Sequence, residues 1–205
     1  MERLARAGNS ELSAITCRNQ LPQGYCLIGP FCRILLGMSQ VSHQEAGQGI
    51  KARFAIVATS DVRTLATDLS GAKIKELAAA AGHEVVYHSI VRNDLDDLLA
   101  LLLHLQSRTD LDVIITTGGT GISRRDQTIA VVDKCITRPL PGFGELFRLL
   151  SYQEIGTAAL MSRAAGGVAH DKLLFALPGS PAAVELAMGK LILPELGHLL
   201  GELRK

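Results

Sequence analysis

Hydrophobic and polar positions along the chain alternate in blocks that are typical of strands and helices in turn. Largely apolar runs at residues 54–58, 84–91, 113–115 and 173–176 are predicted to be strands. Polar residues and then a helical pattern follow each run, which indicates parallel strands joined by right-handed crossovers. We therefore expect an α/β fold: a single doubly wound, mostly parallel sheet with helices on both faces.

Capping residues and apolar stripes indicate where the helices begin and end. Ser70 is predicted to cap a helix that Gly82 terminates, and Asn93 to cap the next one. The second helix carries a leucine stripe that is too short for a coiled coil, so we interpret it as core. Short helices are expected at residues 143–150 and 158–161. A strand-to-helix loop at 177–181 precedes leucine-rich helices that Pro194 interrupts.

The beginning of the chain differs from the remainder. Three of the four cysteines precede Met38, and no sustained hydrophobic period appears before Arg53. We divide the chain into an N-terminal extension, residues 1–50, and an α/β domain, residues 51–205. Residues 1–37 are interpreted as disordered or as a start-site artefact with translation beginning at Met38. A transit peptide is the alternative, although Glu2 and Glu11 disfavour it.

Composition excludes several classes of protein. A hydrophobic content of 47% provides for a core, while a net charge of +1 and an aromatic content of 4% give no footprint for nucleic acid. The apolar runs fall far short of the roughly 20 residues that span a membrane. The cysteines form no C-x-x-C pair and the histidines no zinc spacing, so we expect free thiols and a cytoplasmic protein.

The most informative junction lies where the apolar run 113–115 passes into a loop rich in glycine and threonine. Glycines allow successive backbone N–H groups to face one concavity, which is how backbone holds phosphate, and a tight turn is the alternative. Arg124 and Arg125 flank this loop. Neither a P-loop nor a G-x-G-x-x-G pattern is present. The candidate phosphate-binding residues are Thr117, Gly118, Gly119, Thr120 and Gly121.

Acidic and polar residues follow the other predicted strand ends. Asp126 lies within one loop of the glycines, where it could cap a helix running to Cys135 or hold Mg²⁺ against phosphate oxygens. Arg163 could bind phosphate through its guanidinium or be a surface residue. The remaining polar candidates are Ser60, Asp61, Asp68, Asn93, Asp94, Ser162 and the turn Pro178, Gly179, Ser180 and Pro181. No G-x-S-x-G elbow or paired histidine ligands are found.

These motifs together make the chain similar to a known family. The segments that carry the resemblance are residues 60–61, 67–71, 82–85, 117–121, 141–145, 154–157 and 177–181, and residues 38–42 resemble the opening of such proteins. The chain resembles the MoaB/Mog family of molybdenum cofactor biosynthesis, and within it the MoaB branch. The resemblance covers residues 38 to about 200 of the sequence.

The resemblance implies a molybdopterin-binding domain that assembles as a homotrimer or hexamer. It also implies that other proteins of molybdenum cofactor biosynthesis could be partners. It implies that Mg²⁺ and ATP adenylylate the terminal phosphate of molybdopterin and release pyrophosphate. Asp126 would organise the metal, with Asn93 and Asp94 as further catalytic candidates, while Ser70 and Gly71 join the binding residues.

One position departs from the family pattern. Active members usually carry an acid where this chain has Asn93. Asparagine keeps the shape of the side chain and loses its charge. Two hypotheses therefore stand: a nucleotidyltransferase, molybdopterin adenylyltransferase, or a catalytically weak or inactive molybdopterin-binding or carrier protein with the same fold.

Overall fold

The computed structural model describes residues 49–205, and within them the chain builds one six-stranded sheet in the order β2-β1-β3-β6-β5-β4. Four neighbouring strands run parallel, and β5 and then β4 are antiparallel to their neighbours. The strands are β1 (Arg53–Thr59), β2 (Glu84–Val91), β3 (Val113–Thr117), β4 (Arg138–Pro139), β5 (Ala165–Ala169) and β6 (Lys172–Leu177).

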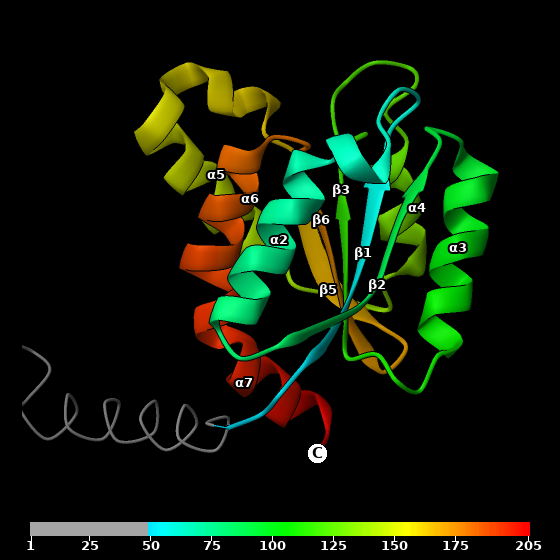
Figure 1. Cartoon of the computed structure of the whole chain (residues 1–205). Helices are drawn as coiled ribbons and strands as arrows, with labels where there is room; N and C mark the ends of the chain where they lie inside the picture. Colours follow the sequence, from blue (N-terminus) through cyan, green and yellow to red (C-terminus); the bar gives the residue numbers. More distant parts are fainter. Residues whose placement is uncertain (1–48) are drawn as a thin grey trace, which may run out of the picture. The chain divides into compact units, whose positions relative to one another are not determined.

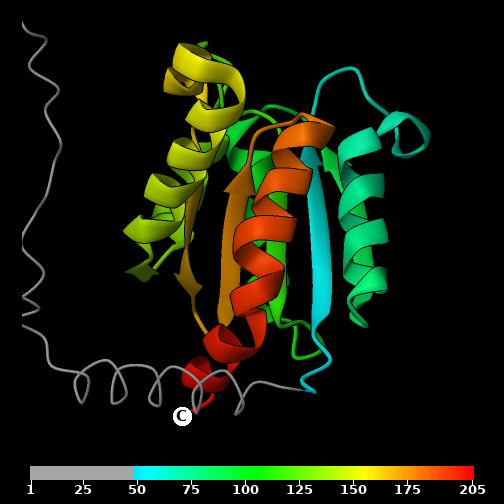
Figure 2. The same ribbon diagram turned by 90° about the vertical axis from the view of Figure 1, so that its left-hand side faces the viewer.

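Helices cover both faces of this sheet (Figures 1 and 2). They are α2 (Leu69–Ala80), α3 (Leu95–Ser107), α4 (Thr128–Cys135), α5 (Pro141–Ile155), α6 (Pro181–Ala187) and α7 (Leu193–Leu203). Shorter turns are the 3₁₀-helices η1 (Leu65–Thr67) and η2 (Gly156–Met161) and the π-helical turn η3 (Met188–Ile192). No helix among residues 49–205 is long and apolar enough to cross a membrane.

Two hydrophobic cores lie on opposite faces of the sheet. On one face, Phe54 and Ile56 of β1 pack with residues of α2, α5, α6 and α7. On the other, Ala55 and Val57 pack against the leucines of α3 and the valines of α4. Alternate residues of one strand thus reach different cores, as the pleat requires. The predicted doubly wound, mostly parallel sheet is confirmed. The leucine stripe is core at Leu98 and Leu102, whereas its last member, Leu103, is 53% exposed.

Three predicted helix caps are wrong by one or two residues. The side chain that caps α2 belongs to Asp68, which accepts from the Gly71 N–H, while Ser70 lies inside the helix. Asp94, and not Asn93, caps α3. The N-cap position of α4 is held by Gln127, so capping this helix is not the role of Asp126. In each case the polar neighbour is thereby available for another contact.

The antiparallel edge of the sheet was absent from the sequence-based prediction. Strand β5 contains Gly166 and Gly167, which weaken a strand pattern. Glycine is required at these two positions by packing. A Cβ at Gly166 would lie 2.7 Å from the Phe175 ring, and one at Gly167 would lie 2.7 Å from the Arg138 carbonyl oxygen. The predicted helix at residues 143–150 is the middle of the longer α5. Predictions for residues 1–37 lie outside the described residues.

Candidate functional site

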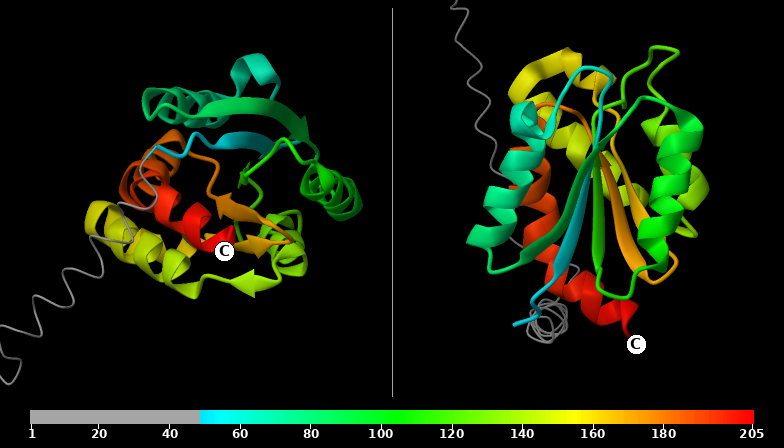
Figure 3. Two further views of the ribbon diagram at one scale, coloured as in Figure 1. Left: turned by 90° about the horizontal axis from the view of Figure 1, so that it is seen from below. Right: turned by 45° about the vertical axis from the view of Figure 1, so that its right-hand side comes forward.

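A cavity of about 440 Å³ opens at the carboxyl ends of the parallel strands. In Figures 1 and 3 this is the end at which the loops after β1 and β3 rise beside each other. Ligands of doubly wound sheets bind at this edge. Predicted residues that line the cavity are Ser60, Asp61, Asn93, Gly118, Gly119, Thr120, Gly121, Asp126 and Gly179.

The glycine-rich loop after β3 offers hydrogen-bond donors and almost no free acceptors. Its carbonyl oxygens are occupied: Gly119 accepts from the Thr128 N–H (3.0 Å), Thr120 from Arg163 Nε (2.8 Å) and Gly121 from Arg163 Nη2 (2.5 Å). The backbone N–H groups of residues 119–122 have no acceptor anywhere in the described part of the chain. Such a row of unpaired N–H groups suits an anion.

Two left-handed glycines give the loop its path. Gly118 has φ +89°, and a Cβ there would lie 2.6 Å from the Thr59 carbonyl oxygen. Gly119 has φ +61°, and a Cβ there would collide with Asn93 Oδ1 and lie 2.5 Å from Thr128 Oγ1. Positive φ is costly for other residues, and these contacts leave no room for a side chain.

Three side chains that approach Gly119 each carry a buried oxygen without a partner. Thr59 Oγ1, Asn93 Oδ1 and Thr128 Oγ1 have no hydrogen-bond partner among residues 49–205. The Asn93 backbone N–H, by contrast, donates to Asp61 Oδ1 at 3.0 Å. Thr59 and Thr128 are 5% and 0% exposed, so their hydroxyls are withdrawn from water as well. A buried, unpaired polar atom is costly, which marks this spot as built for a group that completes it.

Asp126 lies beside the loop with one carboxylate oxygen engaged. Its Oδ2 accepts from the Ser123 N–H at 2.9 Å, and a Cβ on Gly121 would lie 2.6 Å from the same oxygen. Among the described residues no cluster of three or more His, Cys, Asp or Glu could hold a metal by itself. One carboxylate beside a donor-only loop fits Mg²⁺, which usually takes one or two carboxylates and completes its shell with phosphate oxygens and water.

The predicted residues Asp68, Ser70 and Gly71 do not line the cavity, and they make contacts that join neighbouring elements. Asp68 is 1% exposed and joins His88 Nε2 through Oδ2 at 2.9 Å. A Cβ on Gly71 would collide with both of these side chains. Ser70 Oγ donates to the Gly179 carbonyl at 3.0 Å, which ties the start of α2 to the loop after β6.

Several other predicted residues do not line the cavity. Thr117 Oγ1 donates to the Pro178 carbonyl at 3.2 Å, and Ser180 caps α6, of which Pro181 is the first residue. Arg163 does not line the cavity, and two nitrogens of its guanidinium donate to the loop carbonyls. Pro178, Ser162 and Asp94 also lie outside the cavity lining.

Sequence reasoning missed four lining residues: Thr59, Val62, Arg63 and Arg125. Arg63 Nη1 donates to the Gly179 carbonyl at 3.2 Å. Its position just after a strand end was an available signal, and Arg125 had been noted only as a flanking charge. These two arginines bring positive charge to a lining that also contains the carboxylates of Asp61 and Asp126.

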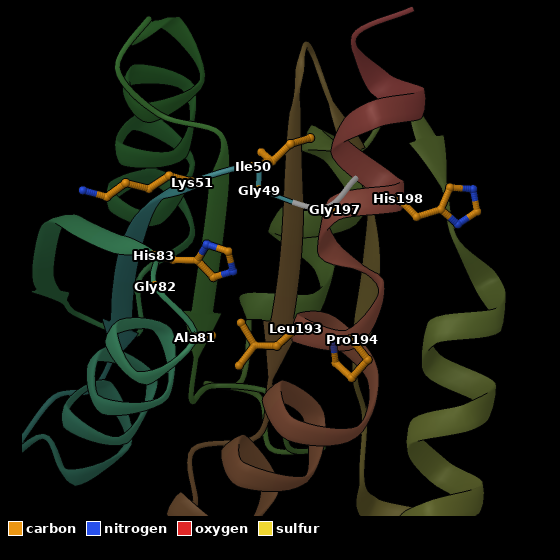
Figure 4. Close-up of a pocket in the computed structure, with 10 residues that line it drawn as sticks. All are labelled: Gly49, Ile50, Lys51, Ala81, Gly82, His83, Leu193, Pro194, Gly197 and His198. Atoms are coloured by element: carbon orange, nitrogen blue, oxygen red, sulfur yellow. The ribbon is translucent and has the colours of Figure 1, made fainter. Parts of the chain in front are cut away.

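A larger cavity of about 580 Å³ lies at the opposite, amino-terminal end of the strands. Its lining comes from residues 49–51, residues 81–83 and α7. Figure 4 shows the side chains of His83 and Leu193 turned toward each other, and those of Lys51 and His198 turned away. This lining contains no carboxylate, hydroxyl or amide side chain. The convergent polar groups place the candidate site at the other end.

Comparison with known proteins gives the family of the chain. The family model described as "Probable molybdopterin binding domain" matches residues 55–198. The chain belongs to this family. The molybdenum cofactor biosynthesis protein B of Bacillus cereus is 45% identical over 169 residues, which are 82% of this chain and 99% of the relative. That of Halalkalibacterium halodurans is 48% identical over 75% of this chain and 91% of the relative.

Solved structures of the family share the fold. A crystal structure of a molybdenum cofactor biosynthesis protein B superposes with a TM-score of 0.74 at 47% identity and covers 76% of this chain and 97% of its own. The tungsten cofactor synthesizing protein MoaB of Pyrococcus furiosus gives a TM-score of 0.67 at 35% identity and covers 76% of this chain and 98% of its own. The predicted membership of the MoaB/Mog family of molybdenum cofactor biosynthesis is confirmed.

Proposed function

We propose that this protein is a molybdopterin adenylyltransferase that uses Mg²⁺ and ATP in molybdenum cofactor biosynthesis. One observation carries the proposal: the carbonyls of residues 119–121 are bound and the N–H groups of residues 119–122 are unpaired, next to a carboxylate. A donor-only loop binds phosphate, and a carboxylate beside it serves a phosphate-bound cation. Membership of a molybdopterin-binding family supplies the second substrate.

The reaction places moderate demands on the protein. An oxygen of the terminal phosphate of molybdopterin attacks the α-phosphorus of ATP. The bond from that phosphorus to the bridging oxygen breaks, and pyrophosphate leaves with the electron pair. A phosphate oxygen is already ionised at neutral pH, so no strong base is needed. Positioning two anions in line and neutralising their charge supply most of the catalysis.

Residues of the chain divide this work. The N–H groups of residues 119–122 bind phosphoryl oxygens, and Arg63 and Arg125 in the cavity lining offset the charge of two anionic substrates. Asp126 would hold Mg²⁺, which would neutralise charge on the transferring phosphates. Ser60, Asp61 and Gly179 complete the lining that orients the substrates.

A non-catalytic molybdopterin-binding protein is the second candidate, and Asn93 favours it. The side-chain oxygen of Asn93 lies buried at Gly119, where the family usually carries an acid. Asp94 does not replace that acid, because its Oδ1 accepts from the N–H groups of Asp96 and Asp97 as the cap of α3. Binding without turnover would be the behaviour of this second candidate.

We also propose that the protein assembles with copies of itself as a trimer or hexamer. Large apolar side chains on α5 and η2 are half or more exposed to solvent, which is unusual for a monomer. They are Leu146, Leu149, Tyr152, Ile155, Leu160 and Met161, and we call them the α5–η2 face. Other proteins of molybdenum cofactor biosynthesis are alternative partners for this surface.

The binding part of the proposal is tested by calorimetric titration of the protein with Mg-ATP and with molybdopterin. Asp126→Asn is expected to weaken Mg²⁺-dependent ATP binding by about tenfold or more, because the amide carries no charge for the cation. Asp133→Asn is the matched control, since Asp133 is an exposed carboxylate on α4 outside the cavity. Equal binding by wild type and both variants would remove Asp126 from the metal site.

A further inference from the structure

The glycine-rich loop after β3, residues 118–122, is called the phosphate loop below. The side chain of Arg163 reaches this loop from a segment that does not line the cavity. Arg163 follows η2 and precedes β5, and its own backbone N–H donates to the Met161 carbonyl at 3.0 Å. Its Nε and Nη2 donate to the carbonyl oxygens of Thr120 and Gly121 at 2.8 and 2.5 Å. One planar guanidinium therefore fixes two consecutive peptide groups of the loop.

Fixing those carbonyls also fixes the direction of the N–H groups. A peptide unit is planar and trans, so its N–H points opposite to its C=O. With the carbonyls of Thr120 and Gly121 turned toward Arg163, the N–H groups of Gly121 and Ile122 point away from it. Thr128 acts in the same way on the preceding peptide, since its N–H holds the Gly119 carbonyl. The loop's unpaired donors thus depend on partners outside the cavity.

Resting on the proposed function, we propose that Arg163 is a positioning residue that orients the backbone donors of the phosphate loop and does not itself bind the substrate. The guanidinium makes the loop a preorganised donor surface, whereas an untethered glycine loop would sample conformations with carbonyls turned toward the anion. Its positive charge also polarises both peptides in the sense that strengthens their N–H groups as donors.

The proposal is tested with Arg163→Ala, Arg163→Lys and, as the control, Arg125→Ala. Arg125 lines the cavity and would act on an anion directly. The first measurement is backbone hydrogen exchange, without ligand, of the hydrogen-bonded amides in and beside the loop, those of Gly118, Ser123, Asp126 and Thr128. We expect Arg163→Ala to raise exchange about tenfold or more in that loop, while Arg163→Lys, which retains a single ammonium, restores part of the protection and Arg125→Ala changes nothing.

The second measurement is the dissociation constant for magnesium pyrophosphate. Arg163→Ala is expected to weaken binding about tenfold, with partial recovery on adding dilute guanidinium ion, which can occupy the vacated place. Arg125→Ala should also weaken binding, without recovery. Unchanged loop exchange in Arg163→Ala would overturn the proposal, and weakened binding with unchanged exchange would make Arg163 a direct ligand.

The two proposals fail in different ways. Should wild type bind no magnesium pyrophosphate, the proposed function would be wrong, and the exchange experiment would still decide whether Arg163 holds the loop. If Arg163→Ala fails to fold, the comparison of Arg163→Lys with wild type decides, because a lysine can satisfy one carbonyl but not two in the same plane. Exchange in Arg163→Lys equal to that of wild type would then overturn the proposal.

Discussion

The backbone N–H of Asn93 donates a hydrogen bond to the carboxylate of Asp61 at 3.0 Å. This contact joins the loops after β2 and β1. The Asn93 side-chain oxygen lies against Gly119, near the Thr128 hydroxyl and the Thr59 methyl group. Residue 93 is thus placed by backbone, and its side-chain oxygen is left without a partner. Whether residue 93 has a neutral amide or a charged carboxylate is the main chemical variable of the site.

Asn93→Asp is expected to raise Mg²⁺-dependent turnover several-fold over wild type. The carboxylate would lie near the unpaired hydroxyl of Thr128, which can stabilise it, and it adds a second acidic group for the cation. Steady-state pyrophosphate release measures the effect. Asn93→Ala is the control, because it removes the side chain without adding charge. Turnover that stays at the wild-type level in Asn93→Asp would show that the missing acid does not limit the reaction.

Gly118→Ala is expected to destabilise the fold more than Gly82→Ala. Both glycines have positive φ, +89° and +83°, so both variants carry the backbone cost of about 1 kcal/mol. A Cβ at Gly82 meets nothing within 4 Å, whereas one at Gly118 meets the Thr59 carbonyl oxygen at 2.6 Å. We expect the difference in unfolding free energy between the variants to be about 1–3 kcal/mol, from urea denaturation. Equal losses would mean that the loop shifts without cost.

Lowering the pH should reduce the stability of the fold, because His83 must then be protonated. Burial lowers the pKa of His83, and its Nδ1 accepts from the Ala52 N–H at 3.3 Å, so the folded state favours the neutral ring. When the pKa is lower in the folded state, the contribution to stability is complete above the pKa of the unfolded chain. It is lost as the pH falls toward the pKa of the folded state. From about pH 7.5 to about pH 5, wild type should lose more unfolding free energy than His83→Gln. His104→Gln, at an exposed position on α3, should behave as wild type. A profile of His83→Gln parallel to wild type would contradict the assignment.

Leu149→Glu should reduce the size of the assembly in solution. Leu149 is 54% exposed within the α5–η2 face, and a charge buried in an apolar interface is strongly unfavourable. Light scattering coupled to size exclusion measures the change. Leu103→Glu is the matched control, because Leu103 is 53% exposed on α3, outside that face. A change with Leu103→Glu alone would place the interface elsewhere.

The sheet could be predicted because four of its strands are largely apolar runs of ordinary strand length. The site loop could be predicted because Gly118 and Gly119 closely follow such a run. The sequence-based prediction missed β5, where glycines exist to make room for Phe175 and a neighbouring backbone, since that packing is not local in sequence. The role of Arg163 was also hidden. Its partners lie 43 and 42 residues earlier in the sequence. A guanidinium in a sequence indicates anion binding far more often than it indicates hydrogen bonds to backbone carbonyls.

The account is tested most directly by incubating the purified protein with metal-free molybdopterin, ATP and Mg²⁺ and following adenylylated molybdopterin and pyrophosphate together. We predict that both products appear in equal amounts with wild type, that Asp126→Asn forms neither while keeping the folded structure, and that Asp133→Asn behaves as wild type. Molybdopterin binding by wild type without either product would contradict the enzymatic assignment and would leave a binding protein in which Asn93 has replaced the required acid.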